Sequence, residues 1–205
     1  MTDFLAIDTS SRYLTVYAQK GEKSSLRHLP ECAMQHSVIL MDEIDKALKE
    51  INLTPQECGF FAAVTGPGSF TGIRIGISAA KGFALAAKKP LKPLTAFDLI
   101  AYNVNSKKFF VVIDAAHAHY YVCGYDGGKV FKEPCYLSEE EVAALCVPLF
   151  GFEDLPFKNY TKMEVKNCLK NAVERCETLS EDMHALYVRK SQAEEVLCAN
   201  KKMGI

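Results

Sequence analysis

The order of predicted elements places the chain in the α/β class, as two related halves that each hold a mixed sheet flanked by helices. Three strand patterns come before any helix: a short buried one at Phe4–Asp8, an alternating one at Tyr13–Ala18 and a third at Lys23–Leu29. The segment Phe4–Ser10 then recurs as Phe110–Ala116, at an offset of 106 residues. This echo of the opening strand and turn predicts that the second half repeats the module of the first.

The first half continues with two helices on either side of a buried strand. The stretch His36–Ile51 has apolar residues at the helical spacing that buries one face. These residues are Val38, Met41, Ile44, Ala47, Leu48 and Ile51. Phe60–Val64 is typical of a buried strand, and Thr71–Lys88 of a helix that ends before Pro90.

The boundary between the halves is expected in the polar stretch Asn103–Lys107. It gives an N-terminal unit of residues 1–104, expected to carry a partner interface, and a smaller C-terminal unit of residues 105–205, whose last helix could pack back on the first. An antiparallel run of three strands, followed by helix, strand and helix, is the order of the ribonuclease-H-like module, which actin-like ATPases carry twice. This analogy concerns the fold and assigns no function by itself.

Charge and composition argue against direct binding of nucleic acid. Lys and Arg total 24 against 25 for Asp and Glu, a formal net charge of -1, and no basic face is evident. If RNA is involved, another subunit is expected to hold it. The eight cysteines include no pair separated by two residues, which predicts neither a zinc knuckle nor a redox pair.

The surroundings of the protein are also predicted from the sequence. Scattered cysteines, and a start without a charged leader and apolar core, are expected of a cytoplasmic protein. The most apolar long stretch, Phe70–Ala87, contains Arg74 and Lys81, so no membrane span is expected.

The turn Asp8-Thr9-Ser10 after the first strand has two interpretations. In duplicated nucleotide-binding folds, an Asp here can hold a metal-bound water, and the hydroxyls and amides that follow can meet phosphates. A tight turn that satisfies its own backbone groups uses the same residue types, and the sequence favours that turn. The matching turn of the second half, Asp114-Ala115-Ala116, offers no hydroxyls. Independent ATP hydrolysis is therefore not expected.

The loop Thr65–Gly72 combines glycines, a proline and hydroxyls. It lacks the Gly-Lys-Ser/Thr ending of a Walker loop. A sharp turn followed by a helix cap explains its residues, although a helix start reached through glycines can also bind an anion.

The helix behind this loop is apolar nearly all round and contains Gly72, Gly76 and Gly82. Each glycine costs about 1 kcal/mol relative to Ala in a helix, so a packing reason is expected. We expect that Gly72 and Gly76, one turn apart, let a helix of another chain approach closely. The alternative is a helix that is wholly internal to this chain.

No catalytic constellation is predicted. His117 and His119 alternate along the chain, so on a strand their side chains face opposite ways and do not form a metal site. No nucleophile–base pair of a hydrolase is evident. We expect no catalytic residue, no metal ligand and no cofactor of the chain's own.

With these motifs the chain resembles the TsaB family, also called YeaZ, of tRNA threonylcarbamoyladenosine biosynthesis. The matching segments are Leu5–Ser10, His36-Ser37, Gly66–Arg74, Ala79 with Lys81-Gly82, Pro93, Thr95–Phe97, Asp114-Ala115 and Tyr187–Arg189. The resemblance is dense over residues 4–116, and the segment from Gly66 with its helix is the specific part. Two positions depart from the family pattern, with Ala116 in place of an Arg and Ala185 in place of a Pro.

The resemblance implies a cytoplasmic, non-catalytic scaffold or activator subunit with two actin-like halves. Its implied partners are TsaD, which carries the metal and transfers a threonylcarbamoyl group to adenosine 37 of tRNAs reading codons that begin with A, and TsaE, an ATPase. ATP and divalent metal are thus expected in the partner subunits, and tRNA is reached through the complex. A homodimer is expected when TsaD is absent.

The resemblance also implies an interface on the helices at His36–Ile51 and Thr71–Lys88. The expected interface residues are His36, Ser37, Leu40, Ile44, Thr71, Gly72, Arg74, Ile75, Gly76 and Ala79. The alternative function is an independent ATP-dependent phosphotransferase or hydrolase of the actin-like superfamily. In that case Asp8, Thr9 and Ser10 would bind the nucleotide.

Overall fold

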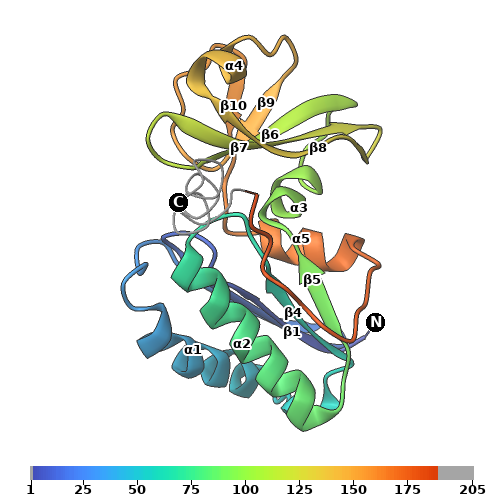
Figure 1. The fold of residues 1–205 in the computed structure, drawn as a ribbon. Helices are drawn as coiled ribbons and strands as arrows, with labels where there is room; N and C mark the ends of the chain where they lie inside the picture. The colour runs from blue at the N-terminus through green and yellow to red at the C-terminus, as the bar shows by residue number, and fades with distance from the viewer. Residues whose placement is uncertain (1, 189–205) are drawn as a thin grey trace, which may run out of the picture.

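The computed structural model describes residues 2–188, in which layers of helix and sheet alternate (Figure 1). Two helices lie below a first five-stranded sheet, two more lie between the sheets, and a second five-stranded sheet lies above them. The strands of the first sheet are β1 (Phe4–Asp8), β2 (Leu14–Lys20), β3 (Lys23–Leu29), β4 (Phe60–Val64) and β5 (Leu91–Leu94). Those of the second are β6 (Lys108–Asp114), β7 (His119–Asp126), β8 (Lys129–Ser138), β9 (Leu149–Gly151) and β10 (Tyr160–Lys162). The helices are α1 (His36–Glu50), the 3-10 turn η1 (Pro55–Glu57), α2 (Phe70–Ala87), α3 (Ala96–Ala101), α4 (Glu139–Ala143) and α5 (Cys168–Arg175).

The first sheet has the strand order β3-β2-β1-β4-β5, with β1 antiparallel to β2 and parallel to β4. The predicted bounds of β1, β3 and β4 agree with the structure. The second strand runs further than predicted, to Lys20, because Lys20 pairs with Lys23 across a two-residue turn. Gly21 has φ +56 in that turn, as a tight hairpin of this hand requires.

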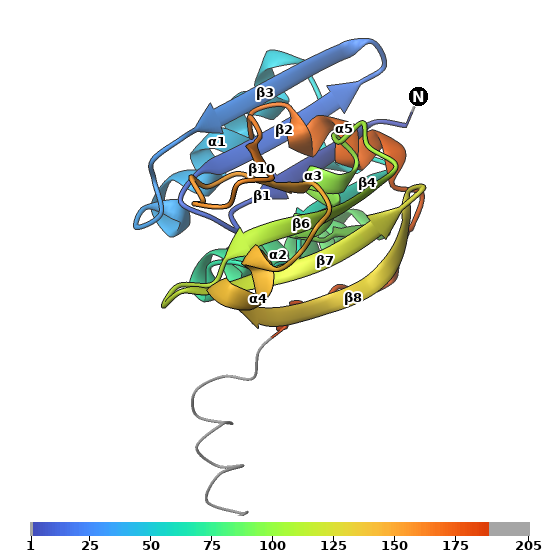
Figure 2. The same ribbon diagram turned by 90° about the horizontal axis from the view of Figure 1, so that it is seen from above.

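The second sheet repeats this topology. Its order read from β8 is β8-β7-β6-β9-β10, with β6 antiparallel to β7 and parallel to β9. Seen from above, β6, β7 and β8 lie side by side (Figure 2). The fold is therefore the predicted pair of ribonuclease-H-like modules. The second module is reduced, because α4 has 5 residues where α1 has 15, and residues 152–159 form no helix in the place of α2.

The layer between the sheets consists of α3 and α5, whose apolar residues share one core with both sheets. A buried lysine ties α5 to the first sheet. The Lys92 ammonium donates to the carbonyl oxygens of Val173 (3.0 Å) and Cys176 (2.6 Å), and it lies 4.3 Å from the ring centre of Phe60. A cation at these unpaired carbonyls caps the end of the helix. Burial lowers the pKa of Lys92.

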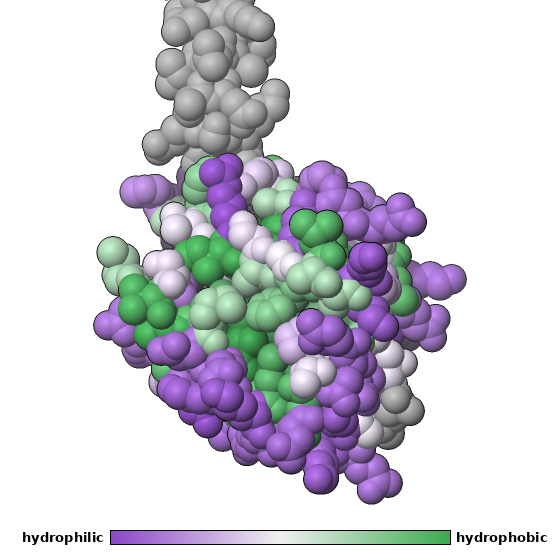
Figure 3. All heavy atoms as spheres, turned by 90° about the horizontal axis from the view of Figure 1, so that it is seen from below, coloured by the Kyte–Doolittle hydropathy of each residue, from purple (hydrophilic) through white to green (hydrophobic). Residues whose placement is uncertain are grey.

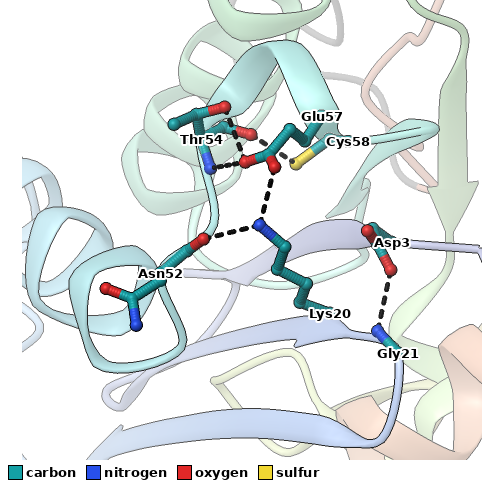
Figure 4. A network of polar contacts seen from close by, with 7 residues as sticks. All are labelled: Asp3, Lys20, Gly21, Asn52, Thr54, Glu57 and Cys58. Atoms are coloured by element: carbon teal, nitrogen blue, oxygen red, sulfur yellow. Dashed lines mark hydrogen bonds and ion pairs between the residues drawn. The ribbon is translucent and has the colours of Figure 1, made fainter.

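A polar network fixes the end of the β2–β3 hairpin to the connection between α1 and β4 (Figure 4). The Lys20 ammonium donates to the Asn52 carbonyl (2.7 Å) and to the Glu57 carboxylate (2.6 Å). The same carboxylate accepts from the backbone N–H and the hydroxyl of Thr54, both at 2.8 Å. These hydrogen bonds, that of Lys20 first, lower the pKa of Glu57 to about 2.

Candidate functional site

The predicted interface helices, α1 and α2, lie next to each other on the outer face of the first sheet (Figure 1). α2 begins after Ser69, whose hydroxyl accepts from the N–H of Gly72 at 3.2 Å. This is the predicted cap, and it satisfies one of the free N–H groups at the helix start. α2 ends where Lys88 turns left-handed, at φ 55.

The close approach at the α2 glycines is made by this chain and not by another, which corrects the sequence prediction. A side chain at Gly72 would overlap the carbonyl oxygen of Thr9, and a Cβ at Gly76 would lie 2.6 Å from the Thr9 hydroxyl oxygen. That hydroxyl donates to the Gly72 carbonyl at 2.7 Å. Gly72 and Gly76 therefore let α2 pack on the turn after β1, and both are buried.

Three predicted interface residues on α1 also face inward. His36, Leu40 and Ile44 are buried, and a ring nitrogen of His36 is hydrogen-bonded to the Tyr13 carbonyl at 3.0 Å. Conversely Val38 and Met41, predicted to be core residues, are 74% and 53% exposed.

A buried carboxylate explains why the inward face of α1 differs from its apolar pattern. Glu43 is buried and accepts hydrogen bonds from Arg27 of β3 (2.8 Å) and from Lys46 (2.6 Å). The bond from Lys46 is the largest cause of its lowered pKa. A buried charge is tolerated when it is paired in this way. Helical periodicity cannot anticipate such a pair, because Arg27 comes from a distant part of the sequence.

An apolar groove runs between α1 and α2. Its cavity measures about 520 Å³, within the range of ligand-binding pockets. It is lined by Ser37, Leu40, Met41, Phe70, Thr71, Arg74, Ile75, Ser78 and Ala79. Six of the ten predicted interface residues are in this set: Ser37, Leu40, Thr71, Arg74, Ile75 and Ala79. Figure 3 shows apolar side chains gathered across this face, with hydrophilic ones around them.

The exposed apolar residues of this face extend beyond the groove. Met34 is 94% exposed and Val38 74%, near the groove residue Phe70, which is 50% exposed; Leu85, 82% exposed, lies apart from them near the other end of α2. Single exposed apolar residues are common, but a contiguous patch next to a groove is typical of an interaction site. The sequence prediction missed three groove residues: it assigned Met41 to the core, began α2 one residue after Phe70, and did not include Ser78.

One edge of the groove is held by a cluster of Phe70, Arg74 and Tyr187. The Arg74 guanidinium lies 3.7 Å from the ring centre of Phe70 and donates to the Tyr187 hydroxyl at 2.9 Å. The Phe70 and Tyr187 ring centres are 5.5 Å apart. Stacking on one ring and bonding to the other holds the guanidinium in place at the lip of the groove. Arg189, which belongs to the same family-like segment as Tyr187, lies outside the described residues.

The proposed nucleotide residues lie at the cleft between the two modules, where they bond within the chain. Asp8, Thr9 and Ser10 are all buried. One carboxylate oxygen of Asp8 accepts from the N–H and the hydroxyl of Ser10, at 2.9 and 2.7 Å, which is the predicted tight turn. Burial nevertheless raises the pKa of Asp8, because these bonds do not offset the loss of water.

The adjoining cavity does not fit a nucleoside triphosphate. It measures about 240 Å³, below the usual range for ligand pockets, and Asp114 and Glu153 are among its lining residues. The one cation in that lining is Arg12, which pairs with Glu31 at 3.4 Å. Burial raises the pKa of Glu153, with the charge of Asp114 adding to the effect. Phosphates would meet carboxylates here, and the Thr9 and Ser10 hydroxyls already donate to Gly72 and Asp8.

Within residues 2–188, no three or more His, Cys, Asp or Glu side chains are placed to hold a metal ion. The ring of His119, at the start of β7, stacks on Tyr136 with ring centres 4.7 Å apart, and one of its nitrogens is hydrogen-bonded to the His117 carbonyl at 2.8 Å. None of the helices in the described part of the chain has the length and apolar character needed to cross a membrane.

Comparison with known proteins identifies the family. The family model of TsaD, tRNA N6-adenosine threonylcarbamoyltransferase, matches residues 28–148, more than half of the chain. A TsaB protein of Bacillus subtilis is 29% identical over 99 residues, which are 48% of this chain and 43% of that protein. A TsaB protein of Haemophilus influenzae is 35% identical over 117 residues, or 54% of this chain and 48% of that protein. The chain thus matches about half the length of these relatives.

The fold has the same relatives. YeaZ of Pseudomonas aeruginosa superposes with a TM-score of 0.75, at 20% identity, over 91% of this chain and 100% of that one. At this identity the likeness concerns the fold. The chain belongs to the family that the TsaD model describes, and it is similar in sequence to TsaB proteins and in fold to YeaZ.

Proposed function

We propose that the chain is a non-catalytic scaffold or activator subunit in the formation of N6-threonylcarbamoyladenosine at position 37 of tRNAs reading codons that begin with A. The relatives named for this pathway support the role. The observation that carries the proposal is the apolar groove between α1 and α2, which lies within the segment matched by the family model.

The proposed partner is TsaD, docked at the groove through Ser37, Met41, Phe70, Arg74 and Ile75. An aromatic and an arginine at the edge of an apolar pocket are residue types that carry much of the energy of protein interfaces. In its absence a second copy of this chain covers the same face. TsaE joins the complex, the partners supply ATP and metal, and tRNA is reached through them. The formal charge of -1 agrees with a subunit that does not hold RNA itself. The compartment we propose is the cytoplasm.

The direct test is reconstitution with TsaD and TsaE of the same organism. We expect co-elution with TsaD and a strict requirement for this chain in the modification assay. Failure of the chain to co-elute with TsaD, together with full modification activity when the chain is left out, would refute the role.

A matched pair of variants locates the interface. Ile75→Asp places a charge in the groove and should weaken TsaD binding by about 30-fold, the loss of one strong interface contact of about 2 kcal/mol. Leu85→Asp is on the same helix, is 82% exposed and does not line the groove, so it should bind as the wild type does. Equal weakening by both variants, or by neither, would place the interface elsewhere.

The alternative is an independent ATP-dependent phosphotransferase or hydrolase. It requires saturable Mg-ATP binding by the isolated chain, and loss of that binding in Asp8→Ala. The small, carboxylate-lined cavity disfavours it. Calorimetric titration with Mg-ATP distinguishes the two functions, because the scaffold binds no nucleotide on its own.

A further inference from the structure

Arg74 is the one charged residue among the described residues that line the α1–α2 groove. Its guanidinium lies against the Phe70 ring, and its Nε donates to the Tyr187 hydroxyl. A guanidinium carries five N–H donors, and within residues 2–188 this group has no further hydrogen bond and no carboxylate partner. In the described part of the chain, the two terminal amino groups of Arg74 are therefore unpaired at the lip of the groove.

The guanidinium is held in position by the fold itself. Its neighbour Tyr187 is anchored because the Leu186 N–H donates to the Thr65 carbonyl at 2.8 Å, and because Met183 of the same segment is buried in the core under α2. The Phe70 ring belongs to the first residue of α2. An arginine ordinarily loses side-chain freedom when it forms an interface contact. Since that freedom is already restricted here, a contact to the exposed amino groups gains in affinity.

The group that fits this place is a carboxylate. A planar guanidinium with two exposed amino groups matches the paired oxygens of a carboxylate or a phosphate. The groove around Arg74 is apolar, and Lys81, the next cation along α2, is already paired with Asp182. A nucleic-acid backbone is bound by a row of cations, so a single arginine in apolar surroundings favours the carboxylate of a protein.

A second copy of the chain does not offer this carboxylate from the matching surface. In a two-fold contact both copies present the same patch, and no Asp or Glu is found among the described residues that line the groove. The apolar lining suits either occupant, whereas Arg74 favours a different protein that brings its own carboxylate.

We propose that the docking partner sets an Asp or Glu side chain against the Arg74 guanidinium, that Tyr187 is the positioning residue for this contact, and that the contact selects the partner over a second copy of the chain. The contact rests on the proposed function, in which TsaD docks at the groove. It adds specificity to an apolar site, because an occupant without the carboxylate leaves a charge partly desolvated and unpaired.

The test measures binding of TsaD to the full chain by calorimetric titration at low and at high salt. Arg74→Gln should weaken binding about tenfold at low salt, and less at high salt because an ion pair at the rim is screened. Arg74→Lys keeps the charge but not the planar fork, so it should restore the salt dependence without the full affinity. The matched control, Lys88→Gln, removes the same charge from an exposed site at the end of the same helix, outside the groove, and should bind as the wild type does.

The role of Tyr187 is tested by its dependence on Arg74. Tyr187→Phe keeps the ring beside Phe70 and removes the hydroxyl, and should weaken binding about fivefold. In the Arg74→Gln background the same change should have no effect, because the hydroxyl acts through the guanidinium. An equal loss in both backgrounds would contradict the positioning role.

The remaining outcomes separate this contact from the proposed function. If the wild type binds TsaD and Arg74→Gln binds equally well, or if Lys88→Gln weakens binding as much, there is no carboxylate contact at Arg74. Sedimentation measures self-association of the same variants: equal weakening of self-association and of TsaD binding by Arg74→Gln would overturn the selection between the two occupants. Absence of TsaD binding by the wild type would instead refute the proposed function, and the contact with it.

Discussion

Replacing Gly76 by Ala tests whether the α2 glycines serve the chain's own fold. The added Cβ would lie 2.6 Å from the Thr9 hydroxyl oxygen and 3.5 Å from a methyl carbon of Ile7. The first distance is well inside contact range, so Thr9 must move, which puts its 2.7 Å hydrogen bond to Gly72 at risk.

The matched control is Gly82→Ala in the same helix. Gly82 is exposed, and a Cβ there meets nothing within 4 Å. Gly82→Ala should therefore gain about 1 kcal/mol of stability from helix propensity alone. Gly76→Ala receives the same gain but loses about 1–3 kcal/mol to overpacking and about 1 kcal/mol with the hydrogen bond, for a net loss of about 1–3 kcal/mol.

Urea denaturation followed by circular dichroism measures the difference on the isolated chain, in the absence of any partner. We expect the Gly82→Ala midpoint above that of the wild type and the Gly76→Ala midpoint below it. If Gly76→Ala is as stable as Gly82→Ala, the glycine does not serve internal packing and the original interface interpretation stands.

Three further predictions concern buried or paired charges. Glu57→Gln should lower the thermal midpoint at pH 7, and the difference between variant and wild type should vanish near pH 2. The hydrogen bonds hold the pKa of Glu57 at about 2 in the folded chain, so the carboxylate stabilises the fold fully above its ordinary pKa of 4.5 and loses this effect as pH falls through 2. Burial raises the pKa of Asp8, so the folded chain retains this proton more readily than the unfolded chain, and the stability of the fold decreases as pH rises above 3.8. Asp8→Asn should therefore flatten the decline in thermal midpoint that the wild type shows between pH 4 and pH 8. A steeper decline in the variant would contradict the raised pKa. Lys92→Met keeps the apolar part of the side chain but removes the hydrogen bonds to two carbonyls at the end of α5. The free energy of unfolding, measured by urea denaturation, should fall by about 1–3 kcal/mol. An unchanged midpoint would mean that these carbonyls find another partner.

Most of the fold was predictable because local patterns determine it. Period-two alternation and short apolar runs located β1, β3 and β4, and the echo of Phe4–Ser10 at Phe110–Ala116 indicated the second module. The extension of β2 was missed, since Gln19 and Lys20 join the sheet through cross-strand pairing and not through their own apolar character.

The site was predictable in position but not in orientation. Composition identified α2 and the resemblance added α1, yet the inward and outward faces were partly exchanged. On α1 the paired Glu43 faces inward while Val38 faces out, and on α2 the glycines fit against Thr9. Both depend on residues far away in the sequence, which neither periodicity nor composition can register.

The path of the chain also bears on how the two modules are joined. α5 and residues 180–188 contact the first sheet, so the second sheet is inserted between two parts of the chain that build the first module. A fragment of residues 1–104 would lose α5, the Lys92 cap and the Met183 side chain, and one face of its sheet would be left bare. Because the first module is completed by its own returning segment, the inserted module can have reduced helices, namely the short α4 and the helix-free stretch 152–159, without exposing the interior of the module that carries the groove.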